Sequence, residues 1–545
     1  MNSSPLDKFY HWETTTPDSP FLMQPIESKW HEYSFANAGK EIRAIAYALR
    51  QLNLPEGSTI AILSKNCAHW IMADLAIWMA GYISVPIYPS LSAPAVRYVL
   101  EHCDAKVLFI GKLDDYKNQR SGIPEDVKKI SFPFYGPGEG LLWEDLIKNS
   151  NNQKSIYRKL ESMATIIYSS GTTGTPKGVM LTFDALDFFG RSAVVSFGID
   201  KPYNFFSYLP LAHIAERAYI EMVALYSGSC IAFAESLETF AKNLAEVKPV
   251  VFGGVPRIYA KFKEGILSKL PQKKLDLLLS IPIIRSVIKK FLQKKLGLSH
   301  AKIIACGAAP IPISLLEWYK KLGIKIQELY GMTENCGYSH GDHGQYFRFG
   351  TVGRAWKDVE CKLSDEGEIL LKHPGLSTGY YKDPETTKST FTSEGFLRTG
   401  DKGRIDSEGF LTLTGRLKDQ FKTDKGKFIA PAAIEMKLLS NTDIEQVCVV
   451  GSGVPQPIVL MNLSIVGKAK SASAISQSIA ATLAQVNPTL ESFERLAKAI
   501  IMKRDWTIDN GLITPTLKVK RNEVEKIHLP MYPVWYEQDD FIIWE

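Results

Sequence analysis

The sequence has few of the features that mark secreted, disulfide-linked or zinc-binding proteins. Only seven of its 545 residues are cysteines, and no two of them form a close CxxC pair. An odd number of scattered cysteines is typical of reduced thiols, which argues against a disulfide framework or a structural zinc site. The amino terminus shows no basic segment followed by an apolar core. We therefore expect no signal peptide and a cytoplasmic location.

Long hydrophobic runs are also missing. The longest apolar stretch, residues 71–89, is interrupted by Asp74, Gly81 and Pro86. A buried helix followed by a strand accounts for it better than a membrane span, which needs about 20 consecutive apolar residues. Hydrophobic residues make up 45% of the chain and charged residues 22%, a globular balance that excludes a wholly disordered protein. A chain of this length should divide into two or more domains.

Charge of one sign accumulates in a single segment. The formal net charge is +6, but residues 257–302 alone contain twelve Lys or Arg and two acidic residues, a local charge of +10. The remainder is close to neutral, and we expect no nucleic-acid partner. Within the segment, the string LDLLLSIPIIRSVIKKFL combines apolar residues with lysines.

This basic amphipathic segment is open to three interpretations. Residues 261–302 could contact an anionic membrane at its inner face, which would help an enzyme to collect fatty acids. They could equally form a solvated pair of basic helices packed on the main domain, or a patch that attracts a polyanion near a nucleotide site.

Helical periodicity alternates with short apolar runs through most of the chain. Between residues 34 and 112, FANAGKEIRAIAYALRQL, HWIMADLAIWMAGY and AVRYVLEHC are separated by STIAILS and ISVPIYP, and AKVLFIG follows. This alternation predicts a layered α/β domain with a largely parallel sheet. After residue 160 we expect further strands at ATIIYSS, NFFSYLP, PVVFGG, AKIIACG and IKIQELY.

The texture changes towards the carboxyl terminus. Short strands punctuated by glycine, such as GEILLKHPG and GFLTLTG, predict β-hairpins between about 350 and 416. A helix near PAAIEMKLLS and a strand near EQVCVVGSG then predict a smaller α+β domain. We divide the chain into a large domain, 1–416, and a small domain, 417–545.

A glycine-rich string, YSSGTTGTPKG at 168–178, follows a predicted strand. Its glycines permit backbone angles closed to other residues, so that consecutive N–H groups can turn towards one anion. Its hydroxyls add donors and Lys177 adds a positive charge, which together favour a polyphosphate. The spacing differs from GxxxxGK[ST], so a P-loop is not indicated. The alternative is an ordinary surface loop, since Gly, Ser and Thr are common loop residues.

Two further motifs are weak by themselves. In YGMTE, residues 330–334, an aromatic ring, a tight turn, a hydroxyl and a carboxylate could stack a base, contact phosphate and hold Mg²⁺. Glu334 could also be a solvated loop carboxylate. In LPLAH, His213 could be a core histidine with both nitrogens satisfied.

Taken together and in order, these strings resemble the signature motifs of the adenylate-forming superfamily, which includes acyl-CoA synthetases, luciferases and peptide-synthetase adenylation domains. The resemblance covers about residues 30–530. It is greatest to AMP-forming long-chain fatty acyl-CoA synthetases, through VPRIYAKF, LPLAHIAER and NGLITPTLKVKR. It implies ATP, Mg²⁺ and coenzyme A as ligands and a fatty acid as substrate. Acyl transfer to a carrier protein, and a catalytically silent protein that binds nucleotide or lipid, remain alternatives. The oligomeric state is not indicated.

The resemblance also implies roles for single residues. The phosphate loop would bind ATP through Ser169, Ser170, Gly171, Thr172, Thr173, Gly174 and Lys177. The nucleotide would further contact Gly307, Ala308, Tyr330, Gly331, Met332, Asp401 and Arg416, with Asp401 on the ribose. The catalytic residues would be His213, Thr333, Glu334 and Lys518, and Glu334 would also be the Mg²⁺ ligand.

The small domain would then turn about Lys418 to present the loop around Gly426 to the thiol. Lys518 would be the catalytic lysine of the small domain, and its neighbours Lys520 and Arg521 would be solvated charges.

Overall fold

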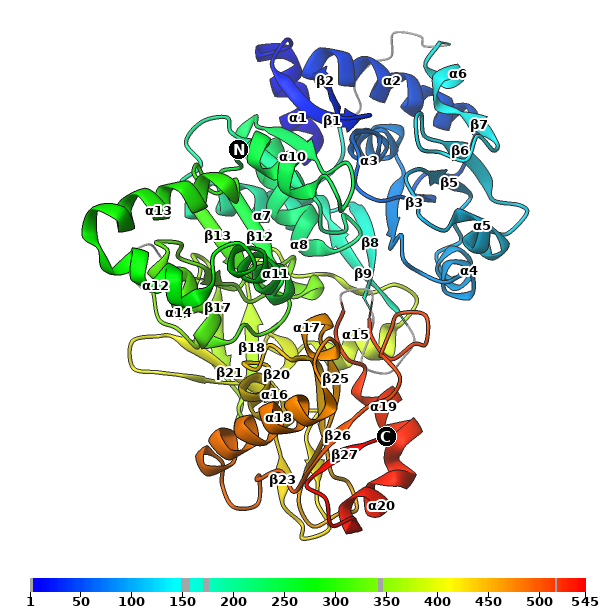
Figure 1. The fold of residues 1–545 in the computed structure, drawn as a ribbon. Coiled ribbons are helices and arrows are strands. Elements are labelled where there is room, and N and C mark those ends of the chain that lie inside the picture. The colour runs from blue at the N-terminus through cyan, green and yellow to red at the C-terminus, as the bar shows by residue number, and fades with distance from the viewer. Residues whose placement is uncertain (1–2, 149–156, 170–175, 342–346, 515–516) are drawn as a thin grey trace.

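The computed structural model describes residues 3–148, 157–169, 176–341, 347–514 and 517–545. A large α/β domain forms the upper part of Figure 1, and a separate small domain built from the carboxyl-terminal residues lies below it. The predicted fold class is therefore confirmed.

The central element of the large domain is an eight-stranded sheet. From β7 to β8 the pairings are parallel, and β9 and β19 then add antiparallel strands at one edge. In spatial order the strands are β19 (Gly379–Tyr380), β9 (Lys177–Thr182), β8 (Met163–Ser169), β4 (Ile83–Ile87), β3 (Thr59–Leu63), β5 (Val107–Ile110), β6 (Lys128–Ser131) and β7 (Leu141–Leu142).

Both faces of this sheet are buried. Along β3, Ile60 and Ile62 enter the core that contains α3 (Ala68–Ala80), whereas Ala61 and Leu63 enter the core beneath α4 (Ala93–His102). Side chains alternate in this way because successive residues of a strand point to opposite faces. All thirteen residues of α3 are buried, so the stretch 71–89 is a buried helix followed by a strand, as predicted.

Two smaller sheets complete the α/β part of the large domain. One contains β10 (Asn204–Ser207), β11 (Cys230–Phe233), β1 (Pro20–Ile26) and β2 (Lys29–Ser34), and the other contains β12 (Val251–Gly254), β13 (Ile303–Cys306) and β14 (Gln327–Glu328). A strand forms within IKIQELY, as expected, but it is shorter than the string, since β14 holds only Gln327–Glu328. Ile324 and Ile326 instead fill the core next to α14 (Ile313–Lys321).

An antiparallel sheet of four strands follows, which confirms the predicted hairpins. Its strands are β17 (Glu360–Leu363), β18 (Glu368–Lys372), β20 (Leu397–Ile405) and β21 (Leu411–Arg416). A further short pair is formed by β15 (His340–Gly341) and β16 (Arg354–Ala355).

The small domain has one mixed sheet with a hydrophobic core on each face. The strands are β24 (Ile444–Val450), β25 (Ile458–Leu463), β26 (Lys498–Ile501) and β27 (Ile542–Trp544), preceded by the short pair β22 (Phe421–Lys422) and β23 (Phe428–Ile429). The helices are α16 (Pro431–Leu438), α17 (Ile465–Lys468), α18 (Ala472–Val486), α19 (Arg521–His528) and α20 (Tyr532–Glu537).

The other helices belong to the large domain. They are α1 (Pro5–Thr15), α2 (Phe35–Gln51), α5 (Tyr116–Gln119), α6 (Trp143–Lys148), α7 (Phe183–Ser196), α8 (Ile214–Glu216), the π-helix η2 (Arg217–Met222), α9 (Val223–Ser227), α10 (Phe240–Val247), α11 (Pro256–Leu267), α12 (Gln272–Ser280), α13 (Pro282–Lys295) and α15 (Pro384–Thr390). No helix among the described residues is both long and apolar enough to cross a membrane.

Candidate active site

Asp401, in the middle of β20, is held by two partners from different parts of the large domain. Arg416 is its register partner on β21, and the Arg416 Nε lies 2.9 Å from Asp401 Oδ1. The Tyr330 hydroxyl donates to Asp401 Oδ2 over 2.8 Å. Tyr330 and Asp401 are both buried. The carboxylate is therefore fixed in place, and its remaining lone pairs can accept hydrogen bonds from ligand hydroxyls.

The segment after Tyr330 turns tightly and presents Glu334. A Cβ on Gly331 would lie 2.6 Å from the carbonyl oxygen of Gly337, so only glycine fits here. Met332 N–H donates to Asn335 Oδ1 over 2.9 Å, which stabilises the turn that contains Thr333. The Tyr380 hydroxyl donates to Glu334 Oε1 over 2.8 Å. The turn thus brings a half-buried carboxylate close to the Asp401 site.

The backbone is strained after β13. Ala308 has φ +65°, in the left-handed region that non-glycine residues rarely adopt. The preceding Gly307 donates its N–H to Gly254 O over 3.2 Å. Such strain costs on the order of 1–3 kcal/mol and persists only where neighbouring structure maintains it, as at ligand sites.

The two ends of the predicted phosphate loop meet in the sheet. Ser169 is the last residue of β8, Lys177 is the first of β9, and the two are register partners. The loop therefore connects two antiparallel strands. The predicted ligands Ser170, Gly171, Thr172, Thr173 and Gly174 lie outside the described residues.

Lys177 contacts the start of α15. Its Nζ donates to Thr386 Oγ1 over 2.8 Å and lies 3.4 Å from Asp383 Oδ2. A small pocket of about 160 Å³ opens beside it, lined by Tyr98, His102, Pro176, Lys177, Tyr381 and Asp383. Lys177 thus links the end of the predicted phosphate loop to the start of α15.

Lys518 of the small domain lies close to Asp401 and Arg416 of the large domain. Its side chain keeps some contact with solvent. Desolvation by the surrounding protein, and secondly the positive charge of Arg416, lower the pKa of Lys518 to about 8. The negative charges of Asp401 and Asp419 oppose this shift. A hydrogen bond from Lys518 N–H to Thr514 Oγ1, 3.1 Å, and a positive φ at Leu517 shape the turn that carries it. Two regions far apart in the sequence, 401–419 and Lys518, therefore form one charged cluster.

His213 is the neutral partner of this cluster. Burial, and secondly the charge of Lys518, lower the pKa of His213 to about 4. Its Nδ1 accepts a hydrogen bond from Ala215 N–H at the start of α8, 3.1 Å. At neutral pH the single ring proton is therefore on Nε2, which can donate to an anionic ligand.

The two remaining predicted residues, Lys418 and Gly426, lie near the start of the small domain in the sequence. Lys418 is exposed between β21 and β22, where the chain passes from one domain to the other. Gly426, with φ +76°, forms the turn between β22 and β23. Lys418 stands in the sequence between Arg416 and Asp419 of the charged cluster, whereas Gly426 belongs to the next hairpin.

Comparisons with known proteins identify the family of this chain. A family model described as AMP-binding enzyme matches residues 9–381, and a second, AMP-binding enzyme C-terminal domain, matches residues 418–528. The chain belongs to the AMP-binding enzyme family.

Several curated relatives of this AMP-binding enzyme are named for the same activity, the ligation of a long-chain fatty acid to coenzyme A. The chain is 29% identical to the long-chain-fatty-acid–CoA ligase FadD15 of Mycobacterium bovis, over 94% of both chains. It is also 29% identical to the peroxisomal long chain acyl-CoA synthetase 6 of Arabidopsis thaliana, over 91% of this chain and 80% of the relative.

Solved structures show the same fold. The O-succinylbenzoate coenzyme A synthetase of Bacillus subtilis in complex with AMP superposes with a TM-score of 0.75 at 22% identity, covering 95% of this chain and 98% of that one. The adenylation domain of a carboxylate reductase from Mycobacterium chelonae gives 0.82 at 20% identity, over 98% and 91%. At these identities the likeness concerns the fold alone.

Sequence reasoning missed some residues of the AMP-binding enzyme's site. Tyr380, Asp383 and Thr386 hold Glu334 and Lys177, and they lie in the polar string GYYKDPETT, which carries no catalytic signature of its own. The expectation that Arg521 is a solvated charge is wrong. Arg521 is mostly buried and its Nη2 lies 2.5 Å from Glu435 Oε1, so it joins α19 to α16.

Proposed function

We propose that this chain is an ATP-dependent ligase that joins a long-chain fatty acid to coenzyme A, with release of AMP and pyrophosphate. The observation that carries the proposal is the charged cluster in which Lys518 of the small domain faces Asp401 and Arg416 of the large domain. Such a cluster suits a reaction in which two anions must meet. The names of the curated relatives support a long-chain acid and coenzyme A as the other substrates.

In the first half-reaction, a carboxylate oxygen of the acid bonds to the α-phosphorus of ATP. The bond from the α-phosphorus to the bridging oxygen breaks, and pyrophosphate leaves with its electron pair. The Lys518 ammonium and the Nε2–H of His213 stabilise the charge that gathers between the carboxylate and the α-phosphate. Asp401 accepts hydrogen bonds from the ribose hydroxyls, and Tyr330 packs against adenine next to the strained Ala308 segment.

Glu334 is the proposed Mg²⁺ ligand. One of its oxygens accepts from Tyr380, and a second remains to coordinate a metal. The described residues contain no cluster of three metal-ligating side chains, which fits a cation held by one carboxylate together with substrate phosphates. When bound, the metal would neutralise phosphate charge.

In the second half-reaction, the thiol sulfur of coenzyme A attacks the acyl carbon of the adenylate and the thiol proton passes to solvent. A carbon–sulfur bond forms, the carbon–oxygen bond breaks, and AMP leaves with the electron pair of that bond. We propose that the small domain turns about Lys418 between the two steps, which withdraws Lys518 and brings the Gly426 turn towards the acceptor.

The proposed location is the cytoplasm, at the inner face of a membrane. A long-chain acid partitions into bilayers, so an enzyme that uses it gains from contact with the lipid surface. We assign this contact to the basic segment, residues 261–302.

Mass analysis of the products tests this function. The purified protein should convert fatty acid, ATP and coenzyme A to acyl-CoA, AMP and pyrophosphate.

A holo-carrier protein supplied instead of coenzyme A tests the alternative acceptor. If the acyl group is found on the carrier protein and no acyl-CoA forms, the protein is an acyl-carrier-protein synthetase and not the proposed CoA ligase. A panel of acids from acetate to eicosanoate, together with aromatic acids, tests the acid preference, and a preference for short or aromatic acids would contradict the long-chain assignment. Nucleotide binding without any product would indicate a silent protein.

A further inference from the structure

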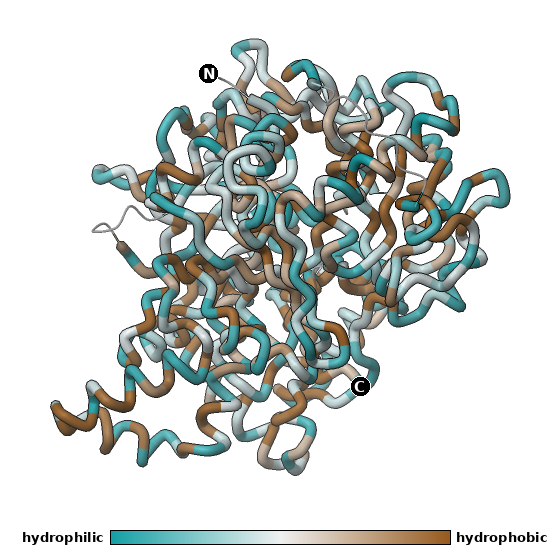
Figure 2. The backbone as a smooth tube through the Cα atoms, turned by 90° about the horizontal axis from the view of Figure 1, so that it is seen from above, coloured by the Kyte–Doolittle hydropathy of each residue, from teal (hydrophilic) through white to brown (hydrophobic). Residues whose placement is uncertain are grey.

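The helical hairpin α12–α13 exposes an apolar stripe. Figure 2 shows the hairpin protruding from the rest of the chain, with hydrophobic residues gathered at its tip. On α13, Ile283 is 81% exposed, Val287 62% and Phe291 53%. These residues recur every fourth position and therefore share one face of the helix. Leu277 of α12 is also exposed. A contiguous apolar surface of this kind marks an interaction site.

The inner side of the hairpin is firmly attached to the large domain. Leu275 and Leu292 are buried in a core that includes Tyr319 of α14. Trp318 Nε1 donates to Gln272 Oε1 over 2.9 Å. Because the hairpin already has a packed side, the outer stripe is not needed to hold it in place.

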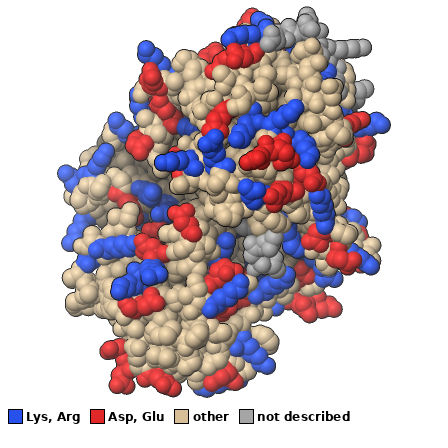
Figure 3. Space-filling view, turned by 90° about the vertical axis from the view of Figure 1, so that its right-hand side faces the viewer, with Lys and Arg blue, Asp and Glu red and all other residues tan. Residues whose placement is uncertain are grey.

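The stripe is surrounded by positive charge. Residues 272–295 contain seven Lys or Arg and one acidic residue, Asp276, which accepts a hydrogen bond from Gln272. With about 3.6 residues per turn, Lys290 and Lys294 fall on the same face as the stripe. On the face of the molecule that carries α4, α5 and α19, by contrast, acidic and basic side chains are intermixed (Figure 3). The combination of apolar and basic side chains complements an anionic bilayer.

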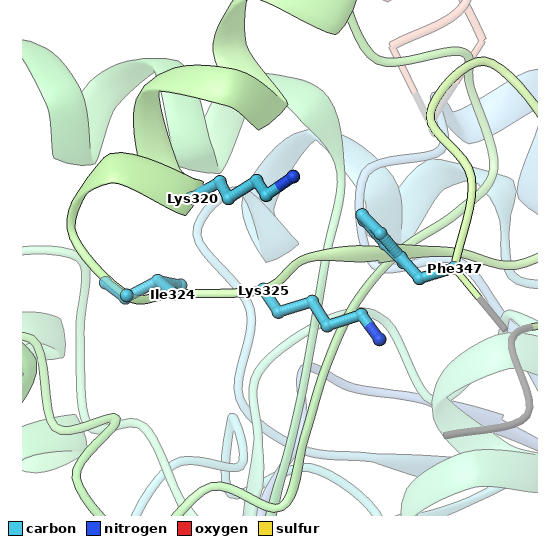
Figure 4. Close-up of a pocket in the computed structure, with 5 residues that line it drawn as sticks. Lys320, Ile324, Lys325 and Phe347 are labelled. Carbon is cyan, nitrogen blue, oxygen red and sulfur yellow. The ribbon is translucent and has the colours of Figure 1, made fainter. Parts of the chain in front are cut away.

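A pocket adjoins the basic end of α13. It has a volume of about 330 Å³ and is lined by Lys320, Gly323, Ile324, Lys325 and Phe347. Figure 4 shows that the side chains of Lys320 and Lys325 both extend towards the Phe347 ring. The Lys325 ammonium lies 4.4 Å from the centre of that ring.

This pocket is continuous with the hairpin. Gln293 of α13 donates to Gly323 O over 3.2 Å. A Cβ on Gly323 would lie only 3.4 Å from the Cδ of Lys289. Lys320 and Lys325 therefore line one concave site whose edge at Gly323 is contacted by the Lys289 side chain, and the two ammonium donors suit a phosphate.

We propose that α12–α13 is a membrane-docking hairpin, in which Ile283, Val287 and Phe291 enter the bilayer and the pocket at Lys320 and Lys325 binds the phosphate of an anionic lipid. This inference rests on the membrane contact proposed above and names its residues and its lipid class. A nucleic acid would be attracted by the same charges, but it offers nothing that would cover the exposed stripe. The bilayer accounts for both features.

Vesicle binding without any substrate tests the proposal. The intact protein should sediment with phosphatidylcholine vesicles that contain phosphatidylglycerol, and weakly with phosphatidylcholine alone. Lys320→Gln/Lys325→Gln should weaken binding about 30-fold, at about fivefold for each lysine. Ile283→Ser/Val287→Ser/Phe291→Ser should weaken it about tenfold or more.

Matched controls use exposed residues elsewhere. Lys117→Gln/Lys128→Gln and Ile527→Ser/Val534→Ser should bind vesicles as the parent does. All variants should keep their activity on acid delivered by albumin, which separates this test from that of the enzymatic function. Equal vesicle binding by the hairpin variants and the parent would overturn the proposal, as would a loss in the controls of the same size. Tighter binding to RNA than to the anionic vesicles would also overturn it.

Discussion

At the scale of single residues, the site depends on the charge state of two groups. Lys518 has a pKa of about 8 and His213 a pKa of about 4. At neutral pH the lysine is therefore mostly a cation and the histidine is neutral. A cation can offset the electrostatic repulsion between the carboxylate and the α-phosphate as they approach, whereas a neutral imidazole can only donate a hydrogen bond. The two groups thus act differently although they lie close together.

Replacing Lys518 tests its role in the first half-reaction. Lys518→Ala should reduce adenylation, followed as pyrophosphate release, by about a hundredfold or more, since a positioned charge in the transition state is removed. Thioester formation from supplied acyl-adenylate should change little. Normal rates in both half-reactions would show that another residue is the catalytic lysine.

The pH dependence of adenylation follows from the lowered pKa. Deprotonation removes the positive charge, so kcat/KM for pyrophosphate release should fall as the pH rises through about 8. Lys518→Arg keeps its charge over this range and should lose that limb. The same alkaline limb in the arginine variant would contradict the assignment.

Asp401 provides a further test at this scale. Asp401→Asn leaves the partly exposed Arg416 without its ion partner and removes a charged acceptor from the ribose. We expect ATP to bind about 10- to 100-fold more weakly, because a hydrogen bond to a charged group contributes about 1.5–3 kcal/mol. Calorimetric titration with ATP measures the change. Unaltered affinity would show that the nucleotide does not contact this carboxylate.

At the scale of the elements, a buried ionic group joins three parts of the large domain. Arg217 on η2 is fully buried, forms ion pairs with Asp74 of α3 and Glu221, and donates to Thr165 Oγ1 of β8 over 2.8 Å. Burial raises the pKa of both carboxyl groups, most strongly that of Glu221. The two carboxyl groups therefore need the arginine, and β8 leads directly to the predicted phosphate loop.

Removing this arginine should destabilise the large domain. Arg217→Met leaves two buried carboxyl groups without their cation, which costs about 3–5 kcal/mol. Urea unfolding followed by tryptophan fluorescence measures the loss. Arg97→Met breaks only an exposed pair with Glu101 and should change stability by less than about 1 kcal/mol. Equal effects of the two substitutions would contradict this account.

The sequence predicted the elements whose pattern is local. The helices α2 and α3 and the strands β3, β4 and β5 followed from periodicity, because each forms its own apolar face or a continuous apolar run. The hairpin β1–β2 was not predicted. Half of β2 is exposed and β1 contains Pro25, so neither alternates like an ordinary strand. The positions of Arg217 and Arg521 depend on neighbours distant in sequence, which no local pattern reveals.

At the scale of the whole molecule, the two domains are linked beyond their connecting chain. Arg257 at the start of α11 forms an ion pair with Glu445 of β24 in the small domain. This pair exists in the arrangement that brings Lys518 close to Asp401 and Arg416, the proposed nucleotide site. If the small domain turns between the half-reactions, as proposed, the pair must break.

The interdomain pair should therefore favour adenylation slightly. It is partly exposed, so Arg257→Gln should slow pyrophosphate release by no more than about fivefold and leave thioester formation from acyl-adenylate unchanged. The charge-reversed double variant Arg257→Glu/Glu445→Arg should restore the rate. Equal slowing of both half-reactions, or no rescue, would contradict a role specific to this arrangement.

The central claim is that the carboxylate attacks the α-phosphorus of ATP. The most direct test uses palmitate whose carboxylate oxygens carry a heavy isotope, with ATP, Mg²⁺ and coenzyme A, and mass analysis of the AMP. We predict that each AMP formed gains one labelled oxygen from the acid. Label in inorganic phosphate, ADP as the product, or AMP without label would contradict the account.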